Sequence, residues 1–265
     1  MTEKEIKELK EKAVSKVKTK PAGEWYKMHH DEDKNDGFWN AKTRSEELAD
    51  AILNNDGVSK LFSIRKITRC DKSRSYFVKE HNIDNAQKKI DENKKLDENK
   101  NPKLGEVLIC NKMFISSAIK PYDCIGSIID YQTPMRNTAN DKGYKGVDLI
   151  SYNKDEGSLI LLEAKKPGSQ ETLLRAVLEV FTYWKIIDHQ KLLYDFSEND
   201  RCKGLDVYNT TIKKAVLIFD NSSAYREYYE GTSPKTIELM KKLGVDFYGI
   251  REKDDDYEVF IPEIE

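Results

Sequence analysis

The chain of 265 residues lacks the features that identify several common protein classes. Its four cysteines are widely separated and form no C-x-x-C pair, which argues against a disulfide framework or a zinc site. No stretch approaches the roughly 18 apolar residues of a membrane span, and the charged N-terminus has no apolar signal segment. We therefore expect a cytoplasmic protein with no membrane partner.

The chain also lacks an excess of either charge. Lys and Arg number 45 and Asp and Glu 47, so the net charge of -2 gives no overall basic footprint for nucleic acid. A local basic groove is not excluded, because binding depends on where charges cluster. The sequence contains no G-x-x-x-x-G-K-[ST] or G-x-G-x-x-G motif and no Ser/His/Asp arrangement. It therefore gives no sign of a phosphate-binding glycine loop or a serine nucleophile.

What is present divides into an N-terminal region, residues 1–100, and a core, residues 101–265. Thr2 and Glu5 fit a capping box at the start of a helix over residues 2–19. Residues 61–69 and 75–80 have the composition of short strands. Four aromatic residues of this region could stack bases, but we favour their anchoring it to the core; they are Trp25, Tyr26, Phe38 and Trp39.

The core predicts a mixed α/β fold. From residue 103 the order is helix, three strands, helix, strand, helix and a final pair of strands, with the strands mostly in one sheet. The second and third strands, residues 147–152 and 159–166, are joined by the turn N-K-D-E-G-S. These two strands are the part of the core that carries unexpected charges.

Strand alternation places Glu163 and Lys165 on one face of the third strand. If residues 154–157 form a four-residue loop, Asp148 on the second strand lies directly opposite Glu163. Two opposed carboxylates are unfavourable in a simple hairpin, whereas a hard cation such as Mg²⁺ or Mn²⁺ between them would be well held. The alternative is an ordinary Asp148–Lys165 ion pair on a solvated strand.

A helix over residues 171–189 follows the hairpin. Arg175, Glu179 and Tyr183 follow one another at a spacing of four residues, on a different face from its apolar stripe. If the helix packs on the sheet, Glu179 can reach the same site. Arg175 could then pair with Glu179 or with a phosphate.

On these residues the chain resembles the PD-(D/E)XK nuclease superfamily. The family pattern is an Asp on one core strand followed by (Asp/Glu)-x-Lys on the next, within an αβββαβ core. Here Asp148 precedes Glu163-Ala164-Lys165, with 14 residues between the two acids. The resemblance covers roughly residues 103–250 and implies a restriction-endonuclease-like fold. The proline of the family motif is replaced by Val147.

The resemblance implies roles for these residues. Asp148, Glu163 and the backbone carbonyl of Ala164 would bind Mg²⁺ or Mn²⁺, and Lys165 would orient the attacking water and neutralise charge on the phosphate. Further metal ligands could come from Glu106, which matches a family position loosely, and from Glu179. The pair Glu179 and Tyr183 matches a Gln-x-x-x-Tyr motif of some members, with Glu in place of Gln. Candidate contacts to nucleic acid are Lys145, Lys166, Arg175 and Tyr183.

The leading interpretation is a metal-dependent nuclease that hydrolyses phosphodiester bonds, with DNA favoured over RNA and a homodimer as one option. The rival is a module on a nuclease-like fold that binds nucleic acid or protein without turnover. A third option is a structural or regulatory protein whose charges form ordinary surface pairs. The three differ in whether Asp148 and Glu163 meet and bind metal.

Overall fold

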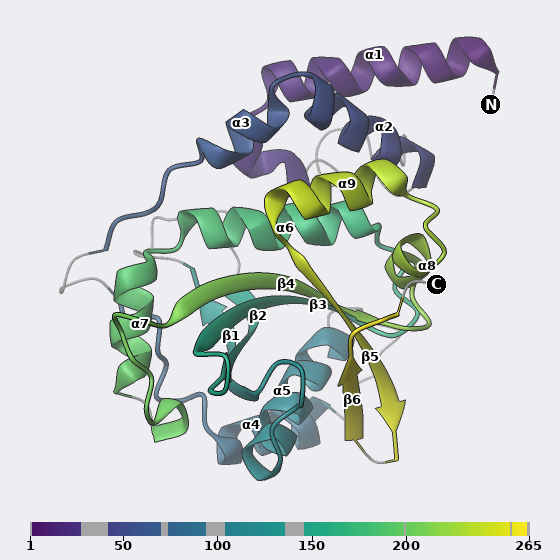
Figure 1. Ribbon diagram of the computed structural model, residues 1–265. Coiled ribbons are helices and arrows are strands. Elements are labelled where there is room, and N and C mark those ends of the chain that lie inside the picture. Colours follow the sequence, from purple (N-terminus) through teal and green to yellow (C-terminus); the bar gives the residue numbers. More distant parts are fainter. Residues whose placement is uncertain are drawn as a thin grey trace.

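A computed structural model describes residues 2–27, 42–69, 74–93, 104–135, 146–198, 200–254 and 256–263. In this part of the chain six strands form one sheet, in the order β1-β2-β3-β4-β5-β6 (Figure 1). The strands are β1 (Ser127–Pro134), β2 (Gly146–Asn153), β3 (Ser158–Lys165), β4 (Thr211–Phe219), β5 (Asp246–Lys253) and β6 (Asp256–Phe260). The β3–β4 and β4–β5 pairs are parallel, and the other three pairs are antiparallel. The mixed α/β fold expected from the sequence is confirmed.

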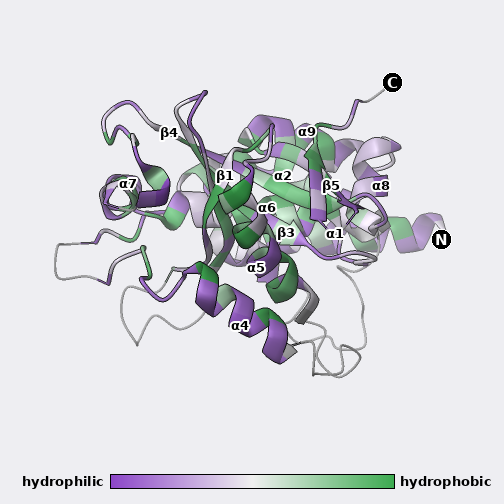
Figure 2. Cartoon of the chain, turned by 90° about the horizontal axis from the view of Figure 1, so that it is seen from below, coloured by the Kyte–Doolittle hydropathy of each residue, from purple (hydrophilic) through white to green (hydrophobic). Residues whose placement is uncertain are grey.

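Helices cover both faces of the sheet (Figure 1). On one face lie α4 (Ile83–Asn93) and α5 (Leu104–Ile119), and on the other α6 (Leu173–Ile186) and α9 (Pro234–Leu243). A further layer over α6 and α9 is formed by α1 (Glu3–Thr19), α2 (Lys42–Asn54), α3 (Gly57–Phe62) and the 3₁₀ helix η1 (Ala22–Lys27). The remaining elements are α7 (His189–Ser197), the 3₁₀ helix η3 (Asp200–Cys202) and α8 (Ser223–Tyr229). Figure 2 shows that α4 turns a hydrophilic surface outward, as expected of an outer helix.

The third strand separates the two halves of the core. All eight residues of β3 are buried, as is typical of a strand covered on both faces. Leu159 and Leu161 pack in the cluster formed with α6, whereas Ile160 and Leu162 pack in the cluster formed with α5. Each fully buried side chain of this kind stabilises the fold by about 1.5–3 kcal/mol. The strand is therefore a rigid platform for the two charged residues at its end.

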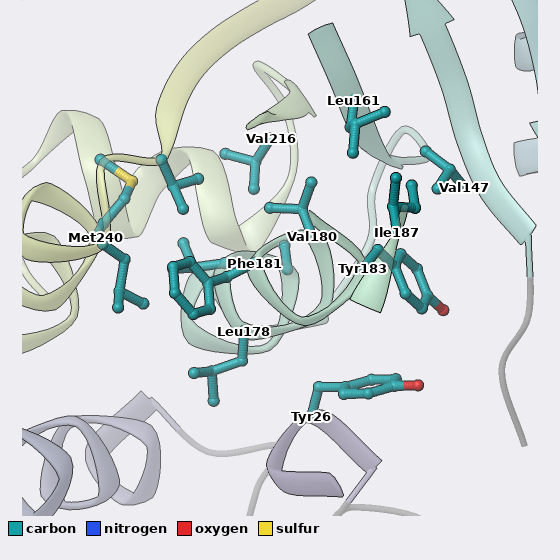
Figure 3. Close-up of a cluster of buried hydrophobic side chains, with 14 of the residues drawn as sticks. Tyr26, Val147, Leu161, Leu178, Val180, Phe181, Tyr183, Ile187, Val216 and Met240 are labelled. Atoms are coloured by element: carbon teal, nitrogen blue, oxygen red, sulfur yellow. The ribbon is translucent and has the colours of Figure 1, made fainter. Parts of the chain in front are cut away.

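The N-terminal region belongs to the same packed structure. Trp25 and Tyr26 are buried, and the Tyr26 ring meets the Tyr183 ring of α6 edge-on, with 5.8 Å between centroids (Figure 3). The Glu46 carboxylate on α2 accepts hydrogen bonds from the backbone N–H of Lys235 and of Thr236 at the start of α9. An acid in this position satisfies donors that the helix leaves free. The expected anchoring role is confirmed for Trp25 and Tyr26, whereas Phe38 and Trp39 lie outside the described residues.

The first helix is confirmed in detail, because Thr2 and Glu5 make the predicted capping box at the start of α1. The two strands expected at residues 61–69 and 75–80 are wrong. Residues 61–62 end α3, and the segment after it is extended without joining the sheet. Its Ile67 N–H bonds to the Ile186 carbonyl at the end of α6 instead, at 2.8 Å. Residues 63–69 have the composition of a strand, but none of the strands in the described residues pairs with them.

Because the N-terminal helices share the core cluster with α6 and α9, we expect the chain to unfold in a single transition. Replacing Ile52, which is fully buried in α2, by Ala should lower the free energy of unfolding by about 2–5 kcal/mol. Urea denaturation followed by circular dichroism and by tryptophan fluorescence measures this. The control is Ile119→Ala, at a site 87% exposed, which should change stability by less than about 0.5 kcal/mol. Two separated transitions would contradict the prediction.

Candidate active site at the fork between two strands

The β2–β3 hairpin has the register that the sequence predicted. Asn153 pairs with Ser158 across the loop 154–157, and the pairing continues to Leu149 opposite Leu162. The next position in this register places Asp148 opposite Glu163. The loop closes through Gly157, whose φ of 59° lies in the left-handed region that glycine adopts without strain. The two acidic residues are therefore brought to the open end of the hairpin.

At Asp148 the two strands diverge. The Ala164 N–H donates to the Asp148 Oδ2 atom at 3.0 Å, so a carboxylate takes the place of a backbone acceptor. The N–H and C=O of one strand residue point to the same side, so the Ala164 carbonyl also points into the fork. This is the carbonyl that the sequence suggested as a metal ligand.

Gln132 on the neighbouring strand holds the other oxygen of Asp148. Its Nε2 atom donates to Asp148 Oδ1 at 3.0 Å. The backbone of Gln132 has a φ of 50°, which is uncommon for a residue other than glycine and is often found at functional sites. Asp148 thus accepts one hydrogen bond from each flanking strand. The sequence gave no signal for Gln132, because neither its backbone angle nor its partner can be foreseen from strand composition.

A second group of polar residues supports this irregular backbone. The Thr133 hydroxyl donates to the buried Asp130 carboxylate at 2.6 Å. This bond joins two residues that lie on either side of Gln132 in the chain. The Nδ1 atom of His81 bonds the second oxygen of Asp130 at 2.7 Å, and its ring stacks on Tyr131. Burial raises the pKa of Asp130, and the bonds to His81 and Thr133 oppose that shift. These residues position Gln132 without themselves contacting Asp148.

Lys165 is the centre of the site. Its ammonium contacts three carboxylates, Glu163 at 2.7 Å, Glu171 at 2.9 Å and Glu179 at 3.6 Å. Lys165 is only 3% exposed, so the cluster holds a buried cation against α6. Glu171, which lies just before α6, was not identified from the sequence as a site residue. The spacing of four residues that groups Arg175, Glu179 and Tyr183 extends back to Glu171 and was the signal that could have found it.

Two further contacts order the α6 side. The Tyr183 hydroxyl donates to Glu179 Oε1 at 3.0 Å, across one turn of helix. Arg175 pairs with Glu171 at 2.5 Å, rather than with Glu179 as one option had it. The buried Glu179 Oε2 atom is the one that lies 3.6 Å from the Lys165 ammonium. The helix therefore presents one restrained carboxylate, with one oxygen held by Tyr183 and the other facing Lys165.

The carboxylates decide the protonation state of Lys165. Burial by itself lowers the pKa of Lys165, but Glu163, Glu179 and Glu171 outweigh it and hold the pKa well above its ordinary value. Burial also raises the pKa of Glu179, yet Lys165 and Arg175 bring it below the ordinary value. Burial raises the pKa of Glu163 well above its ordinary value, and Asp148 and Glu179 add to the effect. Lys165 is therefore a permanent cation at neutral pH.

Asp148 and Glu106 also have raised pKa values. Burial raises the pKa of Asp148 to about 7, assisted by Glu106 and Glu179 and opposed by Lys165. Burial raises the pKa of Glu106, in the first turn of α5, and Lys165 opposes it. Electrostatics thus couples Glu106 to the site from the opposite face of the sheet. Burial is the largest cause of both shifts, and the neighbouring carboxylates add to it.

The site fits a divalent cation in charge and donor type. The five carboxylates (Glu106, Asp148, Glu163, Glu171 and Glu179) face two bases, Lys165 and Arg175. Carboxylate and carbonyl oxygens are the ligands preferred by Mg²⁺ and Mn²⁺. In the described parts of the chain, however, no group of three or more His, Cys, Asp or Glu is arranged around a common metal position. Glu163, Glu171 and Glu179 are oriented toward Lys165 instead.

The expected nucleic-acid contacts lie in different settings. Lys145 falls outside the described residues. The aliphatic part of Lys166 lies against Gly105 at the start of α5, where a Cβ would come within 3.1 Å of it. Arg175 is engaged with Glu171. Tyr183 is 1% exposed and bonded to Glu179, so its position fits an internal support and not a surface contact.

Comparison with protein-family models, with curated proteins and with solved structures gave no match. None of the helices in the described residues is long and apolar enough to cross a membrane. The class of the protein is therefore that of a mixed α/β fold with a charged cluster at the β2–β3 fork. Its activity has to be argued from that cluster.

The raised pKa of Asp148 predicts how stability depends on pH. Between its ordinary value of 3.8 and about 7, the folded carboxyl keeps a proton that the unfolded one has lost. The free energy of unfolding of the metal-free protein should therefore fall as pH rises from about 4 to 7, by up to about 1 kcal/mol per pH unit from this group. Asp148→Asn should show a shallower fall. Urea denaturation at several pH values measures both slopes, and equal slopes would contradict the assignment.

The support of Gln132 can be tested through Thr133. Thr133→Val keeps the shape of the side chain but removes the donor to Asp130 and leaves a buried carboxylate oxygen without that bond. We expect a loss of about 1–3 kcal/mol in the free energy of unfolding, with restoration by Thr133→Ser. Chemical denaturation of the three proteins provides the comparison. If Ser is as destabilising as Val, the hydrogen bond is not the cause.

Proposed function

We propose that the protein is a metal-dependent nuclease that hydrolyses phosphodiester bonds, with DNA as the favoured substrate. The observation that carries the proposal is the meeting of Asp148, Glu163 and Lys165 at the fork of one hairpin, facing Glu179. The order of elements around them, helix, three strands, helix and strand, supports the resemblance to PD-(D/E)XK nucleases. The five carboxylates and the buried ammonium are residue types that this chemistry requires.

The residues that would hold a divalent cation are Asp148, Glu163 and the carbonyl of Ala164, with Glu106 and Glu179 nearby. When bound, Mg²⁺ or Mn²⁺ would polarise the phosphate and lower the pKa of a water molecule. Gln132 and the Ala164 N–H fix the orientation of Asp148 for this role. Glu179 would offer its Oε2 atom, which now lies 3.6 Å from the Lys165 ammonium.

Lys165 acts in this proposal as a fixed positive charge. Its raised pKa keeps it protonated at neutral pH, so it does not remove a proton from water as a base. Its ammonium can donate hydrogen bonds to water or to a phosphate oxygen, where it stabilises the negative charge that develops during hydrolysis. The three glutamates hold it in place before the substrate arrives.

A binding module without turnover is the second candidate. It is favoured by the closed network in which Glu163, Glu171 and Glu179 already neutralise Lys165. Such a network can stabilise a fold without catalysis, although buried ion pairs often contribute little net stability. The two candidates differ in metal affinity and in turnover.

The nuclease is tested by cleavage of single- and double-stranded DNA and of RNA, with Mg²⁺ or Mn²⁺. Glu163→Gln should reduce the cleavage rate by at least about 10²-fold, since it removes a ligand charge. This variant suits the test because glutamine keeps the shape of the side chain and an oxygen that can accept from Lys165, so the fold should stay intact. Lys165→Ala should be inactive as well, but it also leaves buried carboxylates unpaired and should lower stability by about 3–5 kcal/mol.

The matched control is Lys213→Ala, which removes an exposed lysine on β4 that pairs with Glu156 and is remote from the fork. It should cleave at the wild-type rate. Equal rates for wild type and Glu163→Gln, or no cleavage of any substrate by wild type, would refute the nuclease.

Metal binding separates the two candidates directly. Calorimetric titration of Mn²⁺ into the wild-type protein should show binding that Asp148→Ala abolishes, because this residue supplies a carboxylate at the fork. A binding module predicts no Mn²⁺ uptake at this site. Binding that is equal in the two proteins would show that the cation is held elsewhere.

A further inference from the structure

The candidate active site is itself unsuited to holding a polyanion. Its five carboxylates outnumber its two bases, and phosphates repel uncompensated carboxylates. The net charge of the whole chain, -2, offers no general attraction either. A nucleic-acid substrate would therefore need a basic surface at some distance from the fork.

Such a surface exists where the N-terminal region meets the end of α6. A groove with a volume of about 560 Å³ opens between the end of α1, η1, α3 and Ile186 of α6. Four basic side chains line this basic groove, Lys18, Lys20, Lys60 and Arg65, and Glu24 is the acidic residue among its lining. Its charge of about +3 is opposite in sign to that of the fork.

Hydrogen bonds between segments distant in sequence fix the sides of the basic groove. The Lys60 ammonium donates to the Val17 carbonyl at 3.0 Å and ties α3 to α1. The Trp25 indole N–H donates to the Lys20 carbonyl at 3.1 Å, which joins η1 to the end of α1. The bond between Ile67 and Ile186 holds the segment after Arg65 against α6. The basic groove is therefore built by tertiary structure and is not a lone run of lysines.

We infer that the basic groove binds the phosphate backbone of the nucleic-acid substrate, and this inference rests on the proposed nuclease function. Lysine and arginine contacts to phosphate carry most of the sequence-independent affinity for nucleic acid. Glu179 of the site and Ile186 of the basic groove belong to the same helix, and a rise of 1.5 Å per residue separates their backbones by about 10 Å along it. A single duplex turn of about 34 Å spans that separation. The N-terminal helices thereby gain a role in holding substrate.

The test measures DNA binding without divalent metal, so that cleavage plays no part. Fluorescence anisotropy of a labelled 20-base-pair duplex compares the full-length wild type with K18E/K20E/R65E at several NaCl concentrations. The variant should bind at least about tenfold more weakly at 100 mM NaCl, and its plot of log affinity against log salt should lose about 3 units of slope. K18Q/K20Q/R65Q should show a smaller loss in the same direction, and circular dichroism checks that both are folded.

The matched control, K4E/K7E/K88E, makes the same change in net charge at exposed lysines of α1 and α4. It should bind DNA within about twofold of wild type. Equal losses in the groove variant and the control would overturn the inference, because total charge alone would then explain binding. A groove variant that keeps DNA binding but loses binding to phosphatidylserine vesicles would overturn it in favour of a lipid surface.

The outcome for the basic groove can be told apart from the outcome for the nuclease. A loss of DNA binding in the groove variant supports the basic groove even if no metal or substrate yields cleavage. Conversely, wild-type cleavage that Glu163→Gln abolishes, together with unchanged binding by the groove variant, supports the nuclease and refutes the basic groove. Each assay therefore has its own decisive result.

Discussion

The buried ammonium of Lys165 holds the candidate site together. It lies at the end of a strand that is buried along its whole length and contacts carboxylates from β3, from the loop before α6 and from α6 itself. Removing such a cation would leave several carboxylates in a medium of low dielectric, where each repels the others. Glu171 and Glu179 therefore keep Lys165 protonated while α6 is packed on the sheet, and the charge of Lys165 in turn holds α6 there.

The fork between β2 and β3 adds the second constraint. Asp148 replaces a backbone acceptor for Ala164 and is held on its other side by Gln132, whose backbone adopts a left-handed angle. The hydrogen bond between Asp130 and Thr133 closes around that residue. An irregular strand thus orients one carboxylate, whose pKa is raised chiefly by its burial.

The N-terminal helices connect these features to the rest of the molecule. Tyr26 packs against Tyr183, which in turn holds Glu179, and Glu46 satisfies the start of α9. The end of α1, η1 and α3 form the basic groove at the end of α6. An acidic site and a basic surface therefore share one helix. In the proposed hydrolysis of a phosphodiester chain, the first would hold the cation and the second the polyanion.

The sequence by itself determined the mixed α/β class, the capping box at Thr2, the hairpin register and the grouping of Asp148, Glu163, Lys165 and Glu179. These follow from local rules, because turn length fixes which strand residues oppose each other and helical spacing fixes which residues share a face. The strand predicted at residues 61–69 was wrong, because this segment pairs with no strand of the described residues. Tertiary structure alone decided the support by Gln132 and the basic groove. These depend on contacts between segments far apart in the chain, and no local pattern encodes which distant side chains will meet.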